Sequence, residues 1–338
     1  MNGGIVFVTR RIPEPGLAAL RGNGANVRIG QPLDSEPVPR AALIEGARSA
    51  DALLCLLTER IDREVLEASP RLRGIANYAV GFDNIDVGLA TELGIPVSNT
   101  PGVLTEATAD FTFALLLACA RRIPEADRYT REGRFRIWGP TLLLGADVGP
   151  GPDGRRKTLG IVGYGRIGRA VARRARGFDM EVLASDPVPV DDGDVRFVPL
   201  PELLARSDFV TIHAELTPAT RHFIGAPELR RMRRSAFLIN AARGPIVDES
   251  ALVRALREGW IAGAGLDVYE NEPALADGLA SLPNVVLAPH TASATVDTRA
   301  RMATIAATNT IAHLRGERAP DCVNPEVYQG EAWGRRVK

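Results

Sequence analysis

Residues 158–176, TLGIVGYGRIGRAVARRAR, are the stretch of sequence that decides the fold. The stretch begins with small, apolar and β-branched residues, the pattern of a strand that is buried on both faces. It continues through the glycine triplet Gly163-x-Gly165-x-x-Gly168 into a segment with small and apolar residues at helical spacing. A strand, a glycine-rich turn and a helix in this order are typical of a doubly wound fold that binds a dinucleotide.

Each glycine of the triplet has a task in such a fold. Gly163 permits the tight turn, Gly165 lets a pyrophosphate approach the backbone, and Gly168 lets the helix pack closely on the strand. The free N–H groups of Arg166 and Ile167, at the start of the helix, are expected to bind phosphate oxygens. The alternative is an ordinary glycine-rich turn, but the strand before it and the helix after it favour the dinucleotide site.

Asp186, at the end of the next predicted strand, is the candidate for binding the adenosine ribose. A carboxylate at this distance after the glycine triplet can accept hydrogen bonds from the ribose hydroxyls. Its charge would repel a 2′-phosphate, so the sequence favours NAD(H) over NADP(H). The alternative is a simple turn residue at the strand end, before Pro187.

On both sides of this stretch, short apolar runs alternate with helical patterns. This alternation predicts parallel sheets covered by helices, hence an α/β fold, and the chain length suggests two Rossmann- or flavodoxin-like domains. The glycine- and proline-rich segment 145–156 is predicted to be a loop. The predicted strands are residues 5–8, 52–57, 73–78, 96–99, 158–163, 181–186, 208–213, 236–240, 263–268 and 285–290. The predicted helices are residues 13–20, one ending at Gly94, 105–122, 166–176, 249–258 and 296–314.

The composition excludes several classes of protein. The 338 residues carry 41 basic and 41 acidic side chains, and this zero net charge argues against coating a nucleic acid or a membrane surface. The longest apolar stretch, residues 111–120, is about half a membrane span. Three cysteines without CxxC spacing predict no disulfide framework, and four histidines without HxxxH spacing predict no metal site. A reducing, cytoplasmic location fits this composition.

Side chains suited to chemistry follow several of the later strands. Arg243, Asp267 and His290 each lie at or just after a buried strand, at the edge where ligands bind in this architecture. A guanidinium there can bind a carboxylate with two hydrogen bonds, and a histidine there is a candidate acid or base. A single arginine is usually a surface residue and a lone histidine is usually structural, so position is what favours these two. Glu272, before Pro273, is by sequence alone more typical of an exposed loop acid.

The other three histidines are weaker candidates. His213 also ends a strand, but the segment 214–218 that follows it is typical of a loop at the edge of a cofactor. His222 and His313 lie in helical or polar surroundings, and we expect them to be structural.

Four segments together resemble the D-2-hydroxyacid dehydrogenase family. They are VGYGRIGRAVA (162–172), INAARGPIVDESAL (239–252), AGAGLDVYENEP (262–273) and LPNVVLAPHTASAT (282–295). The resemblance covers about residues 4–325. Within the family, the segments most similar to glyoxylate/hydroxypyruvate reductases are LLTERID (56–62), IANYAVGFDNIDV (75–87) and LTEATADFTFALLLACARR (104–122).

The resemblance implies two similar β/α domains with an active-site cleft between them. The catalytic, substrate-binding domain would be discontinuous, with residues 1–99 and 291–322, and the cofactor domain would comprise residues 100–290. Residues 323–338 would form a C-terminal tail. The resemblance also implies a homodimer in which Trp138 contributes to the neighbouring subunit's pocket.

The resemblance also implies an activity and roles for individual residues. A small 2-oxo acid, glyoxylate or hydroxypyruvate, would be reduced to the D-2-hydroxy acid with a nicotinamide cofactor. Arg243 would bind its carboxylate, His290 would be the general acid/base, and Glu272 would pair with the histidine. Further implied substrate contacts are Leu56, Leu57, Val80, Gly81 and Ser293, and further implied cofactor contacts are Thr108, Ala214, Thr217, Ala241 and Asp267.

Departures from the family pattern bear on the cofactor and the substrate. Glu215 stands where relatives usually have proline, and an acid beside the ribose further disfavours NADP(H). Many glyoxylate/hydroxypyruvate reductases, however, have a Ser-Arg pair for NADP where this chain has Ser185-Asp186. The alternatives are a phosphoglycerate dehydrogenase-type enzyme, for which the lid would offer mainly Arg60 as a cation, and an NAD-sensing corepressor-like binding protein of the same fold.

Overall fold

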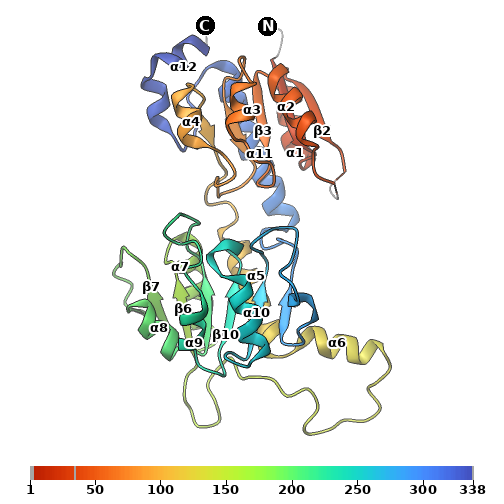
Figure 1. Ribbon diagram of the computed structural model, residues 1–338, viewed down its shortest axis with the longest axis vertical. Coiled ribbons are helices and arrows are strands. Elements are labelled where there is room, and N and C mark those ends of the chain that lie inside the picture. The colour runs from red at the N-terminus through yellow and green to blue at the C-terminus, as the bar shows by residue number, and fades with distance from the viewer. Residues whose placement is uncertain (1–3, 34–35, 337–338) are drawn as a thin grey trace. The chain divides into compact units, whose positions relative to one another are not determined.

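The computed structural model describes residues 4–33 and 36–336. Contacts divide the chain into two compact units (Figure 1). Unit 1 is formed by the residues up to Leu104 together with those from Ala294 onward, and unit 2 is the continuous segment Thr105–Ser293. Each unit is a parallel sheet covered by helices, which confirms the prediction of two parallel-sheet α/β domains.

Unit 1 has a five-stranded sheet in the order β2-β1-β3-β4-β5, with every neighbouring pair parallel. The strands are β1 (Ile5–Arg10), β2 (Asn26–Gln31), β3 (Ala52–Cys55), β4 (Ile75–Asn77) and β5 (Val97–Ser98). The helices are α1 (Glu14–Gly22), α2 (Arg40–Ser49), α3 (Arg63–Glu67), α4 (Val87–Glu92), α11 (Val296–Arg315) and α12 (Glu331–Arg336), with a 3-10 turn at Pro325–Gln329.

Two apolar clusters cover the two faces of this sheet. One cluster joins β3 and β4 to α2, α3 and α4, with Leu43, Val65 and Leu89 among its members. The other joins β1 and β3 to α1 and α11, with Leu17 and Met302 among its members. The last long helix of the chain therefore completes the core that the first hundred residues begin.

In unit 1, β2, α2 and the short helices α3 and α12 were not predicted from the sequence. β2 is the edge strand, and its residues NVRIGQ are only partly buried or exposed. An edge strand packs one side against its neighbour and leaves the other open, so it needs fewer apolar residues than a central strand. α2 buries only Leu43 and Ala47, which gives a weak helical pattern.

The C-terminal residues to 336, predicted as a separate tail, pack in unit 1. The Asn324 side chain accepts a hydrogen bond from the Val97 N–H (2.8 Å) and donates one to the Ile95 carbonyl (3.2 Å). The Arg336 guanidinium donates to the carbonyls of Leu93 (2.6 Å) and Leu72 (3.0 Å). These bonds satisfy backbone groups beside β5 that the short strand leaves open.

Unit 2 has a seven-stranded parallel sheet in the order β12-β11-β10-β9-β6-β7-β8. Its strands are β6 (Thr158–Val162), β7 (Glu181–Ser185), β8 (Val195–Phe197), β9 (Phe209–Ile212), β10 (Phe237–Asn240), β11 (Gly263–Leu266) and β12 (Val285–Leu287). Its helices are α5 (Thr105–Ala120), α6 (Ile123–Arg131), α7 (Arg166–Arg176), α8 (Leu200–Arg206), α9 (Ala226–Arg231) and α10 (Glu249–Arg257), with 3-10 turns at Gly244–Ile246 and Leu279–Ser281.

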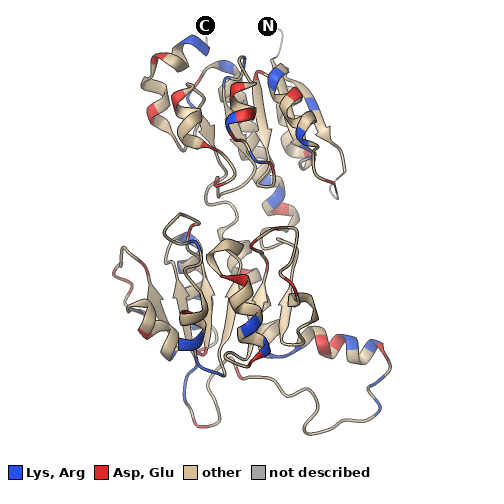
Figure 2. Ribbon diagram, in the orientation of Figure 1, with Lys and Arg blue, Asp and Glu red and all other residues tan. Residues whose placement is uncertain are grey.

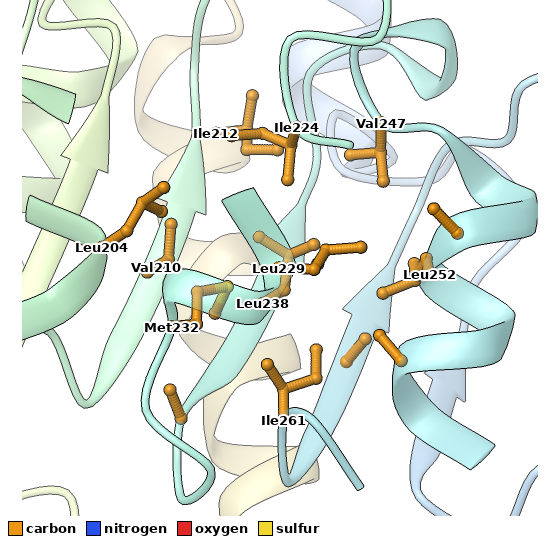
Figure 3. Packing of buried hydrophobic residues seen from close by; sticks show 14 of the residues in the cluster. Leu204, Val210, Ile212, Ile224, Leu229, Met232, Leu238, Val247, Leu252 and Ile261 are labelled. Carbon is orange, nitrogen blue, oxygen red and sulfur yellow. The ribbon is translucent and has the colours of Figure 1, made fainter. Parts of the chain in front are cut away.

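The two faces of the unit 2 sheet have separate cores. α8, α9 and α10 bury Leu204, Leu229 and Leu252 against strand residues such as Val210 and Leu238, as Figure 3 shows. On the other face, α5 and α7 form a second cluster with β6, β7 and β9. From the central β6 the strand order proceeds in opposite directions, to β7 and to β9, and such a switch point is where ligands bind in open α/β sheets.

α6 and the loop after it differ from the prediction of a single helix over residues 105–122. α5 ends at Ala120, and a second helix, α6, begins at Ile123; Pro124 lies in its first turn, where its missing N–H costs nothing. Residues 132–157 form neither helix nor strand. α6 carries charges of both signs and extends with this loop away from the sheet of unit 2 (Figures 1 and 2).

Among the residues that the structure describes, no helix has the length and apolarity needed to cross a membrane.

Candidate active site

The strand ends of unit 2 gather the side chains suited to chemistry. Asp186 follows β7, Arg243 follows β10, Asp267 follows β11 and His290 follows β12. Because all these strands are parallel neighbours in one sheet, their carboxyl ends lie along the same edge. The structure therefore brings these four predicted site residues to one edge of one unit.

His290 and Glu272 form a close pair at this edge. The His290 Nδ1 lies 2.9 Å from the Glu272 Oε2, and the Tyr269 backbone N–H donates to the Glu272 Oε1 (3.0 Å). The His290 backbone N–H donates to the Asp267 carbonyl (2.8 Å), and His290 has a left-handed φ of 54°. Glu272, which the sequence alone would place in solvent, is thus held at both carboxylate oxygens, one of them in contact with the His290 imidazole.

The pKa of Glu272 lies below its usual value. Burial alone would raise this pKa, but the hydrogen bond and the charge of His290, the Tyr269 N–H and the charge of Arg243 outweigh it. Glu272 is therefore ionised at neutral pH, and its carboxylate can accept a hydrogen bond from the His290 Nδ1. The two side chains are 29% and 25% exposed, so the pair remains accessible to a small ligand.

Asp267 is a buried carboxylate that ties β11 to the segment after His290. Its Oδ1 accepts the Thr291 N–H (2.7 Å) and its Oδ2 accepts the Ala292 N–H (2.7 Å). Burial raises the pKa of Asp267 and is the largest influence on it, ahead of these two hydrogen bonds, which lower the pKa. The carboxylate fixes the backbone on the C-terminal side of His290.

Arg243 lies in a short connection that the backbone holds tightly. The Asn240 side chain donates to the Arg243 carbonyl (2.9 Å) and accepts from the Ala242 N–H (3.0 Å). At the next residue, Gly244, an added Cβ would lie 1.9 Å from the Tyr269 carbonyl carbon. Only glycine fits this approach, so the loop of Arg243 and the loop of Glu272 contact each other directly.

The glycine triplet has the geometry that a dinucleotide needs. Gly163 has a φ of 90°, and a Cβ on it would lie 2.6 Å from the Ala214 nitrogen. A Cβ on Gly168 would lie 2.3 Å from the Gly163 carbonyl oxygen. A Cβ on Gly165 would meet no atom within 4 Å, so the space before the N-terminus of α7 is open. The turn and the helix packing use the outer glycines, and the open space at the middle one fits a pyrophosphate.

Asp186 is held in place by backbone donors. Its Oδ2 accepts the Tyr164 N–H (2.7 Å), from within the glycine-rich turn, and its Oδ1 accepts the Val188 N–H (2.8 Å). The carboxylate is thus anchored beside the turn that would hold the pyrophosphate. This is the arrangement expected for a side chain that accepts hydrogen bonds from the adenosine ribose.

The remaining predicted contacts fall into both units. In unit 2, Thr108, Ala241 and Ser293 are buried. Ala214 is half-buried, and Thr217 is exposed in a turn closed by Thr220. At the start of α7, Arg166 is exposed and Ile167 is half-buried. Trp138 is 74% exposed in the long loop of unit 2. Leu56, Leu57, Val80 and Gly81 belong to unit 1, where all four are half-buried.

One residue that positions the pair was missed from the sequence. Tyr269 donates its N–H to Glu272, and its hydroxyl donates to the Ala288 carbonyl (2.8 Å), just before His290. An aromatic residue between two strand-end motifs was the available signal, but the sequence does not reveal that one side chain spans both. Among residues 4–33 and 36–336, no three His, Cys, Asp or Glu side chains are grouped to hold a metal ion.

An open glycine-rich turn, an anchored strand-end carboxylate and a histidine–carboxylate pair at one sheet edge are the features of a dinucleotide-dependent oxidoreductase. Comparison with known proteins agrees with this class. The model of the D-isomer specific 2-hydroxyacid dehydrogenase NAD binding domain matches residues 113–292.

Similar whole proteins are known from several organisms. The glyoxylate reductase of Korarchaeum cryptofilum (strain OPF8) is 54% identical over 330 residues, which cover 96% of this chain and 97% of that protein. The glyoxylate reductase of Thermococcus gammatolerans (strain DSM 15229 / JCM 11827 / EJ3) is 50% identical over 332 residues, with 96% and 97% covered. A crystal structure of an NADPH-dependent glyoxylate/hydroxypyruvate reductase from Sinorhizobium meliloti, in complex with NADP and malonate, is 33% identical, with a TM-score of 0.84 and 96% and 98% covered.

The chain belongs to the D-isomer specific 2-hydroxyacid dehydrogenase family. It is an NAD(P)-dependent dehydrogenase that reduces a 2-oxo acid by hydride transfer from the nicotinamide cofactor. This confirms the family and the enzyme class that the sequence motifs predicted.

Proposed function

We propose that the protein reduces glyoxylate or hydroxypyruvate to the D-2-hydroxy acid, with Arg243, Glu272 and His290 as its catalytic residues. The observation that carries this proposal is the His290 Nδ1–Glu272 Oε2 contact of 2.9 Å at the sheet edge that also bears Arg243. The names of the relatives from Korarchaeum and Thermococcus support glyoxylate, and that of the Sinorhizobium enzyme supports hydroxypyruvate as well.

The mechanism divides the work among the three side chains. The Arg243 guanidinium binds the substrate carboxylate with paired hydrogen bonds and polarises the neighbouring carbonyl. When bound, the nicotinamide cofactor supplies the hydride for the carbonyl carbon. His290, as an imidazolium, donates its Nε2 proton to the oxygen of the forming alcohol. Glu272 on Nδ1 keeps the ring oriented, so that Nε2 faces the substrate oxygen.

Unit 1 would complete the substrate site, with residues 1–99 and 291–322 as the catalytic domain and 100–290 as the cofactor domain. The backbone N–H groups of Val80 and Gly81 would bind the substrate carboxylate, and Leu56 would line the lid. Ser293 and Thr108 would border the substrate and the nicotinamide.

We propose that NAD(H) is preferred over NADP(H). The Asp186 carboxylate is held by two N–H groups, and its charge would repel a 2′-phosphate. Glu215, exposed in the loop after β9, would add a second negative charge near the ribose. The Sinorhizobium relative is named NADPH-dependent, so titration of both cofactors is needed. In Asp186→Ser we expect NADH affinity to fall and the preference for NADH over NADPH to shrink by about tenfold. Tighter NADPH than NADH binding by the unaltered protein would contradict the preference.

We also propose a cytoplasmic homodimer. Three large apolar side chains of the loop after α6, Phe135, Ile137 and Trp138, are 56%, 81% and 74% exposed, which favours an interface with a second copy. The free thiols Cys55, Cys119 and Cys322 fit a reducing compartment. Sedimentation of the unaltered protein and of Trp138→Ala would test the dimer. The substrate KM of the same two proteins would test whether Trp138 contributes to the neighbouring subunit's pocket.

The decisive experiment is an assay of NADH oxidation with four 2-oxo acids. The decrease in NADH absorbance is followed with glyoxylate, hydroxypyruvate, phosphohydroxypyruvate and pyruvate. We expect the highest kcat/KM with glyoxylate or hydroxypyruvate. A strong preference for phosphohydroxypyruvate would instead indicate a phosphoglycerate dehydrogenase-type enzyme. No oxidation with any of them, despite NADH binding, would indicate a cofactor-sensing binding protein.

A further inference from the structure

Glu249 is a buried carboxylate next to the proposed acid–base pair but not part of it. It is the first residue of α10, directly after the N-cap Asp248, and is 4% exposed. Its Oε1 accepts the Glu270 N–H (3.3 Å), and its Oε2 accepts the Ala276 N–H (3.2 Å). In return, the Glu249 N–H donates to the Glu270 Oε2 (3.4 Å).

These bonds hold the loop that carries Glu272 on both sides of that residue. Glu270 lies before Glu272 and Ala276 lies after it, so one carboxylate spans the two ends of a short loop. Between them, Glu272 reaches His290 at 2.9 Å. The rigid first turn of α10 thus fixes the distance between the loop and the imidazole.

The charges around Glu249 indicate that it is not buried there to form an ion pair. Burial raises the pKa of Glu249 most, and the negative charges of Glu270 and Glu272 raise it further. The charge of Glu270 is instead compensated by His222 Nε2 (2.6 Å) and Arg221 (3.2 Å). A carboxylate kept in such surroundings is stabilised by the backbone N–H groups that it binds.

We propose that Glu249 is a positioning residue for the reaction, which holds the 270–276 loop so that Glu272 stays on His290. This inference rests on the proposed function, because it takes His290 and Glu272 as the acid–base pair. Glu249 acts through Glu272 and touches neither substrate nor cofactor. Its removal lets Glu272 drift from the imidazole, so the ring of His290 is no longer held in its orientation.

The titratable and charged groups around Glu249 and around the loop and pair that it holds come from four parts of unit 2. They are Asp248 on α10; Tyr269, Glu270 and Glu272 in the held loop; Arg221 and His222 in the segment before α9; and Arg243 and His290 at the strand ends.

The first test is the pH profile of Glu249→Gln. The amide can accept one N–H but places its own N–H₂ against the other, so one side of the loop is released. We expect kcat/KM for the 2-oxo acid to fall about tenfold or more. We expect the alkaline limb of the kcat/KM profile to move to lower pH, because His290 must be protonated for reduction. The KM for NADH should be unchanged, since the glycine-rich turn belongs to other strands.

Glu249→Asp separates positioning from charge. The aspartate keeps the negative charge but is one methylene too short to reach both N–H groups. If the position of the loop matters, kcat/KM falls in this variant too. The alkaline limb of its kcat/KM profile then lies between the limbs of the unaltered enzyme and of Glu249→Gln. An unaltered profile in Glu249→Asp would mean that only the charge acts on His290, and this would overturn the proposal.

Asp208→Asn is the matched control. Asp208 is another buried carboxylate of unit 2, 7% exposed, which accepts the Thr158 N–H (2.9 Å) and pairs with Arg233 (3.0 Å). It precedes β9, at the opposite end of the sheet from His290. We expect this variant to lose stability but to keep the pH profile. A shifted limb in Asp208→Asn would assign the effect to general loosening of unit 2 and overturn the proposal.

A direct measurement does not depend on turnover. The chain has four histidines, so the His290 ring resonances can be assigned by their loss in His290→Gln and followed by NMR. Glu249→Gln should move these resonances, because the contact between Glu272 and His290 loosens. If the unaltered protein reduces no 2-oxo acid, the proposed function fails while this spectrum still tests the contact. If the unaltered protein is active and Glu249→Gln leaves the His290 resonances in place, only the present inference fails. If Glu249→Gln does not fold, Glu249→Asp, which shortens the same side chain, must move them.

Discussion

The carboxyl edges of the two sheets are built on the same plan but from different chemistry. The edge of unit 2 carries side chains that titrate or bear charge, Asp186, Arg243, Asp267 and His290. At the corresponding edge of unit 1, amides bind the loop carbonyls: Asn77 donates to the Gly81 carbonyl (2.9 Å) and Asn99 to the Val80 carbonyl (2.7 Å). The buried carboxylate there, Glu59, accepts from the Thr9 hydroxyl (2.7 Å) and the Leu56 N–H (2.7 Å).

Asn84 connects the loops at the edge of unit 1. Its Nδ2 donates to the carbonyls of Leu56 (3.1 Å) and Glu59 (3.0 Å), and its Oδ1 accepts from Asn77 (3.0 Å). These neutral bonds fix peptide groups without adding protons that could titrate. The difference teaches that a repeated β/α architecture can assign proton transfer to one edge and a fixed shape to the other.

The largest expected effect comes from removing the proton donor at the edge of unit 2. In His290→Ala, turnover of the 2-oxo acid should fall by about 10²-fold or more, because general acid catalysis is lost. NADH binding, followed by its fluorescence, should be retained, since the glycine-rich turn is intact. Near-normal turnover in this variant would refute the assignment of His290.

The next effect concerns the contact between two catalytic loops. Gly244→Ala places a methyl group where the Tyr269 backbone lies, 1.9 Å away, so one loop must move. We expect unit 2 to lose about 2–4 kcal/mol of unfolding free energy, measured by denaturant titration. As a control, Gly165→Ala adds a methyl group where no atom lies within 4 Å, so stability should be kept while NADH binding weakens. Equal stability losses in the two variants would contradict the close approach.

A variant at the edge of unit 1 sharpens the comparison. Asn84→Ala removes three hydrogen bonds that hold the loops of Leu56 and Gly81. We expect the KM for the 2-oxo acid to rise about fivefold, from roughly 1 kcal/mol of binding lost as the loops loosen. The pH profile of kcat should not move, because no titratable group changes. A shifted pH profile would show that the two edges do not divide the work as proposed.

The smallest effect near neutral pH is the acid sensitivity that a histidine with a buried Nδ1 gives each unit. Burial lowers the pKa of His213 in unit 2 to about 3 and that of His313 in unit 1 to about 4. Their Nδ1 atoms are buried without a hydrogen-bond partner among the described residues. Both folded pKa values lie below the unfolded value of about 6.5. The stability that each neutral, buried histidine permits is therefore fully present above pH 6.5 and is lost as the pH falls toward 4 for His313 and toward 3 for His213.

The size of this loss can be measured by unfolding the protein at several pH values. Each histidine should cost about 1.4 kcal/mol of unfolding free energy per pH unit below about pH 6.5. His313→Gln should remove the loss in unit 1, and His213→Gln the loss in unit 2. If the free energy of unfolding of a variant falls with pH as steeply as that of the unaltered protein, the replaced histidine is not the cause.

The sequence predicted those parts of the fold that depend on local pattern. The central strands, α7, and the placement of Arg243 and His290 at strand ends follow from apolar runs that stop at a polar residue. The edge strand β2 was missed because a half-exposed strand lacks such a run. α6 was missed because it buries no residue and its charged residues give no apolar face, and because Pro124 lies in its first turn.

The site was predictable only in part for a similar reason. Glu272 became a candidate through its family resemblance, because its own neighbours indicate an exposed loop. The Tyr269 backbone N–H binds the Glu272 carboxylate directly, and Glu249, 21 residues before Glu270, binds the Glu270 N–H in the same loop. The first contact depends on backbone geometry and the second joins segments that are distant in sequence. Periodicity carries no information about such contacts.

The order in which the two units can form follows from how the chain passes between them. Unit 2 is one continuous segment, so all its strands exist once synthesis reaches Ser293. Unit 1 still lacks α11, whose residues such as Met302 complete one of its two cores, and the Asn324 contacts to β5. During translation, the part that binds the cofactor is therefore complete first, and the first hundred residues must wait for the last forty to close their core.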